Sequence, residues 1–571
     1  MDIKYCLVDS YYKHIKNNRV KDSIWSSKSK NITVAKEEKF ALGIMIKSDE
    51  EFNCSLDLNN NVCYKGLINN IRLDIKTKED IKDNFKLSFI DYVKDDNGDF
   101  IGDVILREPF HFIKEKETRM IWVEGKIPKD FKEKSLDLKI KFYFQKGYTK
   151  EEEMESLNIK VDLLDITLKP LKDYEFYLDL WQHPSNWARM YKVPLWSDDH
   201  FKIIENYLKE LVTLGQKTIC CIVSDFPWGG QSCYKVFENS SNLFEINMIS
   251  LKKDKKGKFL FDFSNLDRYI EICMKLGIEK EIDLFGISGL WDAKGFGNPI
   301  KDYRDPIRVR YFDESMDNFR YIDSKKELGE YIKALFNHLI EKGWWDKVRV
   351  MSDEPSDSEF VNTYVEFLDS LIENHKVTYK TALHSEECFE NGKEKFKDIS
   401  LSLPLLLKYR NEIQKTKNDL NYKKGALTYY VCCMPDRINN FLCSPLIESR
   451  LIPWITYYFN LDGFLRWDYA IWPKDPLEEM SYKYPHWKAG DMLFVYPGRD
   501  MKPLRSLRWE NLRFGIQDYQ LFKMLEERGI SKETIYKEII EKNLGKKEDM
   551  KYINSFAVSM PECAEIFSRK I

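Results

Sequence analysis

Neither an excess of charge of one sign nor a long hydrophobic run occurs in the sequence. Its 90 Lys and Arg residues almost balance 93 Asp and Glu residues, leaving a formal net charge of −3. So small a charge provides no field for gathering nucleic acid or anionic lipid. No stretch approaches the ~18 apolar residues of a membrane-spanning helix, and the N-terminus lacks the apolar run of roughly 7 to 15 residues of a signal peptide. We therefore expect a cytoplasmic protein without a nucleic-acid or membrane partner.

The 12 cysteines are not spaced as metal ligands. There is no Cys-x-x-Cys pair and no Cys/His cluster at zinc spacing, although Cys220 adjoins Cys221 and Cys432 adjoins Cys433. We interpret the cysteines as reduced, mostly buried thiols of a cytoplasmic protein. No metal is expected.

Aromatic residues are abundant, at 14% of the chain, with 14 Trp, 32 Tyr and 35 Phe. An indole can stack on the apolar face of a pyranose ring while polar neighbours bind the sugar hydroxyls. Aromatic side chains also fill ordinary cores. Composition alone leaves both interpretations open.

Short alternating runs separated by polar turns fill the first part of the chain. The turn Asn97-Gly98 is a strong hairpin signal, and regular strand spacing without helical periodicity predicts an antiparallel β-sandwich over residues 1–168. The clearest strand-like runs are Phe85 to Ile90, Asp103 to Leu106, Met120 to Val123 and Leu136 to Phe144.

After Pro170, strand-like and helical segments alternate, which indicates a parallel sheet. Eight such units predict a (β/α)8 barrel over residues 169–530, and the pattern of residues 531–571 predicts a helical extension packed on it. No Gly-x-Gly-x-x-Gly turn follows the first strand, so no dinucleotide cofactor is expected. The eight predicted strands are Tyr174 to Trp181, Lys217 to Ser224, Glu281 to Ile287, Lys347 to Asp353, Val377 to Leu383, Asp398 to Leu403, Leu427 to Cys433 and Gly463 to Trp467.

The fourth barrel strand ends in two carboxylates, Asp353 and Glu354, followed by Pro355. Barrel active sites lie at this end of the strands. Two neighbouring acids cannot both ionise freely, so the drier one should have a raised pKa and donate a proton near neutral pH. One acid and one base can cleave an acetal. Alternatively, Asp-Glu-Pro is the N-terminal cap of a helix.

The acid pair belongs to a set of five motifs. In order they are FDFSNLDRYIEICMKLGIEKEI from Phe261, Asp353-Glu354, GFLRWDYAIWP from Gly463, YPG from Tyr496 and LRWENLRFGIQDYQL from Leu507. Together these motifs resemble glycoside hydrolase family 123. The resemblance covers about residues 170 to 530, and that family also carries a β-sandwich before its barrel.

The resemblance implies an exo-acting, retaining β-N-acetylgalactosaminidase acting on oligosaccharides or glycoconjugates such as glycolipid-derived glycans, without a cofactor. In this scheme the 2-acetamido oxygen of the substrate attacks C1 and forms an oxazolinium ion. Glu354 would protonate the leaving oxygen and then activate water. Asp353 would orient the acetamido N–H and stabilise its developing positive charge, a contact that strengthens in the transition state.

Further residues near predicted strand ends are candidates for substrate binding, each with a packing role as its alternative. Arg466 either grips a sugar hydroxyl with Asp468 or pairs with it. Tyr429 and Tyr430 face opposite sides of one strand, and we assign Tyr429 to the site. We interpret Arg508, Glu510, Arg513 and Asp518 as a structural ion-pair face. The predicted substrate-binding residues are Trp181, His183, Asp225, Trp228, His384, Tyr429, Trp467, Asp468 and Tyr496.

Two other functions remain open from the sequence. One is a conventional retaining glycosidase with a protein nucleophile elsewhere in the barrel, and the other is a non-catalytic glycan-binding protein. The sequence leaves the preferred epimer, the aglycone and the oligomeric state undetermined.

Overall fold

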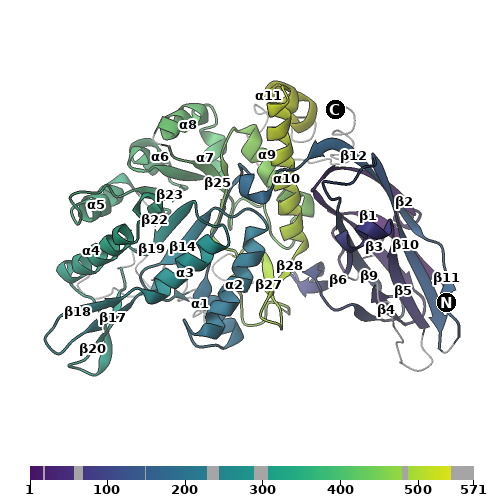
Figure 1. Cartoon of the computed structure of the whole chain (residues 1–571), viewed down its shortest axis with the longest axis horizontal. Coiled ribbons are helices and arrows are strands. Elements are labelled where there is room, and N and C mark those ends of the chain that lie inside the picture. Colours follow the sequence, from purple (N-terminus) through teal and green to yellow (C-terminus); the bar gives the residue numbers. More distant parts are fainter. Residues whose placement is uncertain are drawn as a thin grey trace.

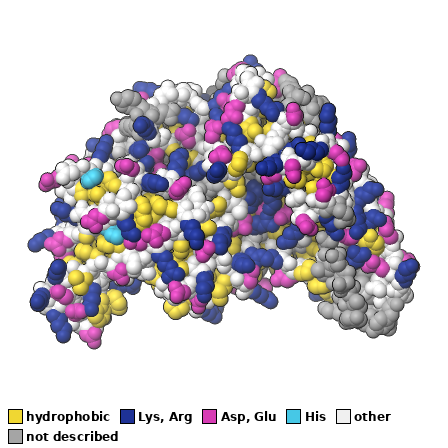
Figure 2. Space-filling view, in the orientation of Figure 1, with side chains coloured by type: hydrophobic (Ala, Val, Ile, Leu, Met, Phe, Trp, Pro, Cys, Tyr) yellow, Lys and Arg dark blue, Asp and Glu magenta, His cyan; other side chains and the backbone are white. Residues whose placement is uncertain are grey.

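The computed structural model of the chain describes residues 1–16, 18, 20–56, 69–147, 149–227, 244–288, 307–355, 357–422, 424–478 and 487–541. The strands of the N-terminal part stand to one side of a ring of parallel strands and helices, and the long helix α10 (Leu507–Glu527) lies between the two (Figure 1). Basic and acidic side chains are mixed over both halves of the face in Figure 2.

Two mainly antiparallel sheets form the N-terminal part. One has the order β1 (Ile3–Asp9), β3 (Lys39–Ser48), β9 (Thr118–Lys126), β6 (Phe85–Lys94) and β7 (Phe100–Ile105). The other has the order β2 (Ser29–Lys36), β12 (Leu157–Thr167), β10 (Ser135–Lys146), β5 (Asn69–Lys76), β4 (Phe52–Leu56) and β8 (Phe110–Ile113), with β11 (Glu152–Glu153) beside β10. Alternate side chains of both sheets share one apolar core, as the sandwich prediction requires, and they include Leu7, Ile44, Leu73 and Ile140.

The predicted Asn97-Gly98 turn joins β6 to β7. The Asp95 carboxylate accepts the backbone N–H groups of Asn97 and Asp99, both at 2.9 Å. Gly98 has a φ of +89°, in the left-handed region that glycine adopts without strain. The turn prediction is therefore confirmed.

Eight parallel strands form a nearly closed barrel, each within or at the edge of a predicted run. Their order is β13 (Tyr177–Leu180), β26 (Gly463–Arg466), β25 (Leu427–Tyr430), β24 (Asp398–Ser402), β23 (Tyr379–Leu383), β22 (Val348–Asp353), β19 (Glu281–Phe285) and β14 (Thr218–Ile222). A single bridge between Leu178 and Gln216 links β13 to β14. The Gln216 amide extends this seam, because it accepts the Leu180 N–H at 3.0 Å and donates to the Leu180 carbonyl at 3.1 Å.

Helices follow every barrel strand. They are α1 (Pro184–Tyr191), α2 (Asp198–Val212), α3 (Ser264–Lys275), α4 (Lys325–Glu341), α5 (Ser358–Asp369), α6 (Glu386–Asn391), α7 (Leu403–Lys408), α8 (Ile413–Tyr422), α9 (Leu446–Tyr458) and α10. Before α9 begins, the Asn439 amide donates to the carbonyl groups of Cys432 and Pro435, which holds this segment as a loop.

The segments that follow β14 and β19 meet in one small sheet beside the barrel (Figure 1). Its order is β18 (Phe259–Asp262), β17 (Ser250–Lys253), β20 (Arg310–Asp313) and β21 (Asn318–Tyr321). Two short pairs also form, β15 (Phe226–Pro227) with β16 (Phe244–Glu245) and β27 (Val495–Pro497) with β28 (Pro503–Arg505). Of the predicted C-terminal extension, α11 (Lys532–Ile535) and a π-helical turn (Tyr536–Ile540) are described, while residues 542–571 lie outside the described part. None of the helices in the described ranges is long and apolar enough to cross a membrane.

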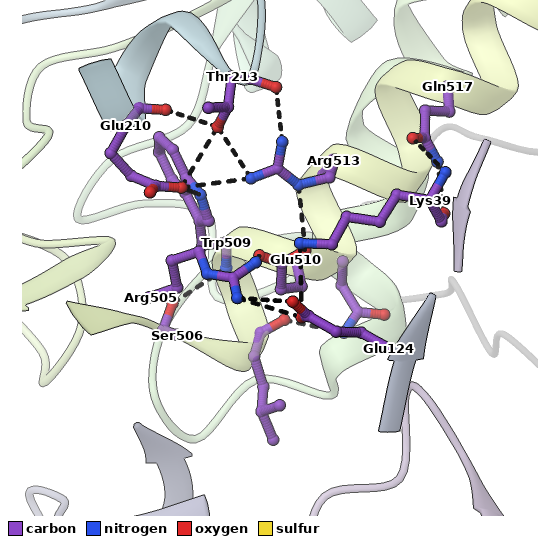
Figure 3. Close-up of polar contacts among 12 residues, drawn as sticks. Lys39, Glu124, Glu210, Thr213, Arg505, Ser506, Trp509, Glu510, Arg513 and Gln517 are labelled. Carbon is purple, nitrogen blue, oxygen red and sulfur yellow. Dashed lines mark hydrogen bonds and ion pairs between the residues drawn. The ribbon is translucent and has the colours of Figure 1, made fainter. Parts of the chain in front are cut away.

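Helix α10 joins the barrel to the N-terminal sheets through buried ion pairs (Figure 3). Glu510, which is fully buried, lies 2.6 Å from Arg505, 3.0 Å from Arg513 and 3.3 Å from Lys39 of β3. The same helix places Asp518 against Arg450, at 2.7 Å. The interpretation of these motif residues as structural ion pairs is confirmed.

Two aspartates on this interface offer a matched test of its stability. Asp103 is buried and accepts from Arg508 at 3.0 Å and from the Tyr496 hydroxyl at 2.6 Å, whereas Asp500 is half exposed and pairs with Arg107 at 2.5 Å. Asp103→Asn leaves a buried guanidinium without its counter-charge, so we expect the free energy of unfolding to fall by about 3–5 kcal/mol. Asp500→Asn should change it by about 0–1 kcal/mol. Urea unfolding of both variants measures the difference, and equal midpoints would contradict the account.

Candidate active site

Asp353 and Glu354 stand where β22 ends at the carboxyl end of the barrel. Asp353 pairs with Ala382 of β23, and the Glu354 N–H donates to the Ala382 carbonyl at 3.1 Å. Glu354 has a φ of +46°, in the left-handed region that side chains other than glycine rarely adopt. Neighbours on a regular strand face opposite sides. The left-handed backbone at Glu354 is strained, as is common at functional sites, and it interrupts the alternation of side chains between Asp353 and Glu354.

Glu354 has two polar partners from neighbouring strand ends. The Tyr430 hydroxyl, at the end of β25, donates to Oε1 of Glu354 at 2.5 Å. Nδ1 of His384, just after β23, lies 3.5 Å from Oε2. Three barrel strands therefore bring a carboxylate, a phenol and an imidazole together.

The two acids differ in their affinity for a proton. Both reach solvent, yet surrounding protein leaves them poorly hydrated. Burial, and then the charge of Glu354, raise the pKa of Asp353 to about 8. Burial also acts on Glu354, but the hydrogen bond and charge of His384, together with the hydrogen bond from Tyr430, outweigh it and lower the pKa of Glu354. The pair thus holds one proton near neutral pH.

His384 is the predicted binding residue that the structure brings to the acid pair. Its side chain is 57% exposed, so a substrate can reach it. The hydrogen bond to Glu354 raises the pKa of His384, and protonation of the imidazole would strengthen that contact. His384 can therefore influence the charge on Glu354.

The candidates at the first two strands lie in the protein interior. Trp181 is buried and packs edge-on against Phe285, with ring centroids 4.8 Å apart. His183 is fully buried, and burial keeps its pKa well below the ordinary value. Asp225 accepts the Asn247 N–H at 3.1 Å and the Tyr321 hydroxyl at 3.2 Å, contacts that fix the insertion after β14. Trp228 lies outside the described residues.

Two predicted binding residues after the eighth strand, Asp468 and Trp467, have different surroundings. Asp468 is fully buried and accepts from Nε of Arg466 at 3.0 Å, which settles the open alternative in favour of their pairing with each other. Burial raises the pKa of Asp468 to about 8. Trp467 is only partly buried and lies beside Trp487, with ring centroids 5.6 Å apart.

Two of the predicted site residues point elsewhere. The Tyr429 hydroxyl donates to the Ile452 carbonyl of α9 at 2.8 Å, so this side chain lies outside the barrel. Tyr430, one position later, faces Glu354 because side chains alternate along a strand. The Tyr496 side chain is buried and binds Asp103 of the N-terminal sheets rather than the site. The assignments of Tyr429 and Tyr496 were wrong.

Comparison with known proteins identifies the family. The model described as "Glycoside hydrolase 123, catalytic domain" matches residues 181–525, more than half of the 571-residue chain and including both acids. The chain belongs to glycoside hydrolase family 123. The resemblance seen in the motifs is thereby confirmed, and the protein is a glycoside hydrolase.

A solved family 123 structure shares this fold. It is the glycoside hydrolase from Clostridium perfringens whose structure was analysed for glycolipid glycan hydrolysis, with a TM-score of 0.75 and 19% identity over 92% of this chain and 89% of that one. A β-glucuronidase from Bacteroides uniformis is matched with a TM-score of 0.28 and 11% identity, over 82% of this chain and 48% of that one. No curated protein sequence matches the chain.

The site of this family 123 hydrolase is built from side chains of the barrel strands. Within the described ranges, no three His, Cys, Asp or Glu side chains gather as a metal site would require. The chemistry that the arrangement offers is proton transfer by the acid pair, tuned by Tyr430 and His384.

Proposed function

We propose that this family 123 hydrolase is an exo-acting, retaining β-N-acetylgalactosaminidase that uses the 2-acetamido group of its substrate as the nucleophile. Terminal β-linked GalNAc of oligosaccharides such as glycolipid-derived glycans is the proposed substrate, since the similar Clostridium perfringens enzyme is associated with glycolipid glycans. The observation that carries the proposal is the pair of adjacent acids at the carboxyl end of β22, with the Tyr430 hydroxyl and the His384 imidazole beside Glu354.

Each acid has one role in the proposed mechanism. Glu354 protonates the leaving oxygen and, as a carboxylate, later activates water. Asp353 accepts the acetamido N–H, whose positive charge grows as the carbonyl oxygen attacks C1. The sugar's own oxygen supplies the new bond to C1, so the protein needs no nucleophile.

In the proposed mechanism, substrate binding moves the proton that the pair shares from Asp353 to Glu354. In the free enzyme the higher proton affinity lies on Asp353, whereas the mechanism needs an ionised Asp353 and a protonated Glu354. An acetamido N–H that donates to Asp353 favours its carboxylate form, which lowers the pKa of Asp353. The shared proton then passes to Glu354. A substrate that carries the acetamido group therefore leaves Glu354 protonated, as a general acid must be.

Hydrolysis of paired aryl glycosides tests the proposal. Aryl β-N-acetylgalactosaminide should be cleaved with a higher kcat/KM than the gluco epimer, and the first sugar detected by NMR should be the β-anomer. Release of the α-anomer first would rule out retention. Preference for the gluco epimer would overturn the proposed specificity, and an absence of turnover on either would favour a binding protein.

Tyr430 and Tyr429 provide a matched pair for the pH dependence. The Tyr430 hydroxyl stabilises ionised Glu354 and lowers its pKa, so its removal in Tyr430→Phe raises that pKa. The acidic limb of the kcat/KM profile should therefore move up by roughly one pH unit, since part of the carboxylate stays in water. Tyr429→Phe, whose hydroxyl lies outside the barrel, should leave the limb in place. Equal profiles for the two variants would contradict the assignment of Tyr430.

The alkaline limb of the kcat/KM profile reports the loss of the last proton from the pair Asp353 and Glu354. In the wild type, kcat/KM should fall as the pH rises through about 8, where Asp353 loses its proton and the pair becomes doubly ionised. A profile flat from pH 7 to 10 would show that the shared proton plays no part.

We also propose a cytoplasmic location. Nine cysteines within the described residues are free thiols, and six of them are buried, which suits a reducing compartment. Activity found only in the culture supernatant of intact cells would contradict this location.

A further inference from the structure

Two adjacent cysteines follow β25 at the rim of the site. The Sγ atoms of Cys432 and Cys433 are 3.8 Å apart, and both residues are partly exposed. Among the other described cysteines only Cys443 reaches the surface, and the remaining six are buried. Cys432 and Cys433 are therefore a thiol pair that small reagents can reach.

The two thiols differ in their affinity for a proton. A hydrogen bond between them lowers the pKa of Cys433 and raises that of Cys432. Arg466 also favours the Cys433 thiolate, while burial and the charges of Asp491 and Glu354 oppose it. A thiolate is the attacking species in thiol–disulfide exchange. Cys433 is thus the nucleophile of the pair, and Cys432 is placed to resolve it.

The pair is linked to the acid pair through the chain and through charge. Cys432 is two residues from Tyr430, whose hydroxyl binds Glu354. The charge of Glu354 acts on both thiols, and Cys433 in turn raises the pKa of His384. Oxidation of Cys432 and Cys433 would therefore affect Tyr430 and His384, the two polar partners of Glu354.

The backbone here has little freedom to absorb such a change. The Val431 carbonyl accepts from buried Arg466 at 3.1 Å, and the Cys432 carbonyl accepts from the Asn439 amide at 2.8 Å. Bringing the two sulfur atoms from 3.8 Å to a bonding distance of about 2.05 Å must strain these contacts or move Tyr430.

We propose that Cys432 and Cys433 form a redox-modifiable dithiol site that low-molecular-weight disulfides oxidise to an intramolecular disulfide, which lowers hydrolysis at the neighbouring acid pair. The Cys433 thiolate attacks one sulfur of the disulfide RSSR and releases RS⁻. Cys432 then loses its proton and attacks Sγ of Cys433, releasing the second RS⁻. The two thiols of the protein are oxidised and RSSR is reduced to two RSH, so atoms and electrons balance. The effect on hydrolysis rests on the proposed function, whereas disulfide formation does not.

Tryptic mapping after treatment of the full-length, reduced protein with oxidised glutathione tests the site. Cleavage after Lys424 and Arg437 gives GALTYYVCCMPDR, whose only cysteines are the pair. We expect this peptide to be lighter by two hydrogen atoms and to resist iodoacetamide until dithiothreitol is added. Alkylation of both thiols after oxidant treatment would overturn the proposal.

Activity on aryl β-N-acetylgalactosaminide is followed in the same samples. Oxidation should lower kcat/KM at least about tenfold, since a displacement near 1 Å can cost on the order of 100-fold, and dithiothreitol should restore it. Cys432→Ser/Cys433→Ser should resist the oxidant, whereas Cys443→Ser should respond like the wild type. A disulfide that leaves kcat/KM unchanged would overturn the proposed effect of oxidation on hydrolysis. A protein that forms the disulfide but cleaves no aryl glycoside even when reduced would overturn the proposed function, not the dithiol site.

Discussion

Replacing Glu354 with glutamine is expected to lower kcat/KM for a natural glycan by about 10²–10⁴-fold, the usual contribution of general acid–base catalysis. The amide cannot protonate the leaving oxygen, and it cannot remove a proton from water. Aryl glycosides whose leaving group needs no protonation should be affected much less in the first step. Steady-state kinetics on substrates of graded leaving-group pKa measures this dependence.

A surface glutamate provides the control for this substitution. Glu386 lies two residues beyond His384 and forms an exposed ion pair with Lys408. Glu386→Gln should leave kcat/KM unchanged. A Glu354→Gln variant whose loss is the same for every leaving group would exclude Glu354 as the general acid.

Replacing Asp353 with asparagine is expected to lower kcat by about 10²–10³-fold, the scale found when a transition-state electrostatic contact is removed. The asparagine side chain is neutral, so it cannot offset the positive charge that develops on the acetamido nitrogen. This loss should be similar for good and poor leaving groups, unlike that of Glu354→Gln. An Asp353→Asn variant that retains wild-type kcat would remove the proposed role of Asp353.

The barrel was predictable because each strand is a short apolar run between helical segments with regular periodicity. All eight strands lie where the pattern indicated them, and the acid pair stands at the expected end. Short helices such as α6 and α7, of six residues each, hold too few turns to give a periodic signal in the sequence.

The sequence could not show which of the two alternating sets of side chains on a strand faces the barrel axis. Alternation made it clear that Tyr429 and Tyr430 point oppositely, but the choice between them depends on the register of β25 in the nearly closed barrel. Tyr430 lies inside and binds Glu354, which corrects the choice.

Long-range pairing also concealed the roles of polar motif residues. Tyr496 and Arg508 both bind Asp103, about 400 positions earlier in the chain. Inside the barrel, Lys380 lies 2.7 Å from Asp179 and 2.7 Å from Glu281, so strands that look apolar in sequence also carry buried charges. Only the folded structure brings such residues together, and no local pattern distinguishes them from binding residues.

The most direct test of the central claim compares two substrates that differ only at C2. If the acetamido oxygen is the nucleophile, replacing this group with hydroxyl should abolish measurable turnover of the aryl β-galactoside, and an acetamido-mimicking thiazoline should inhibit the enzyme at low concentration. Comparable hydrolysis of both substrates, with no inhibition by the thiazoline, would show that the protein supplies the nucleophile and would contradict the account.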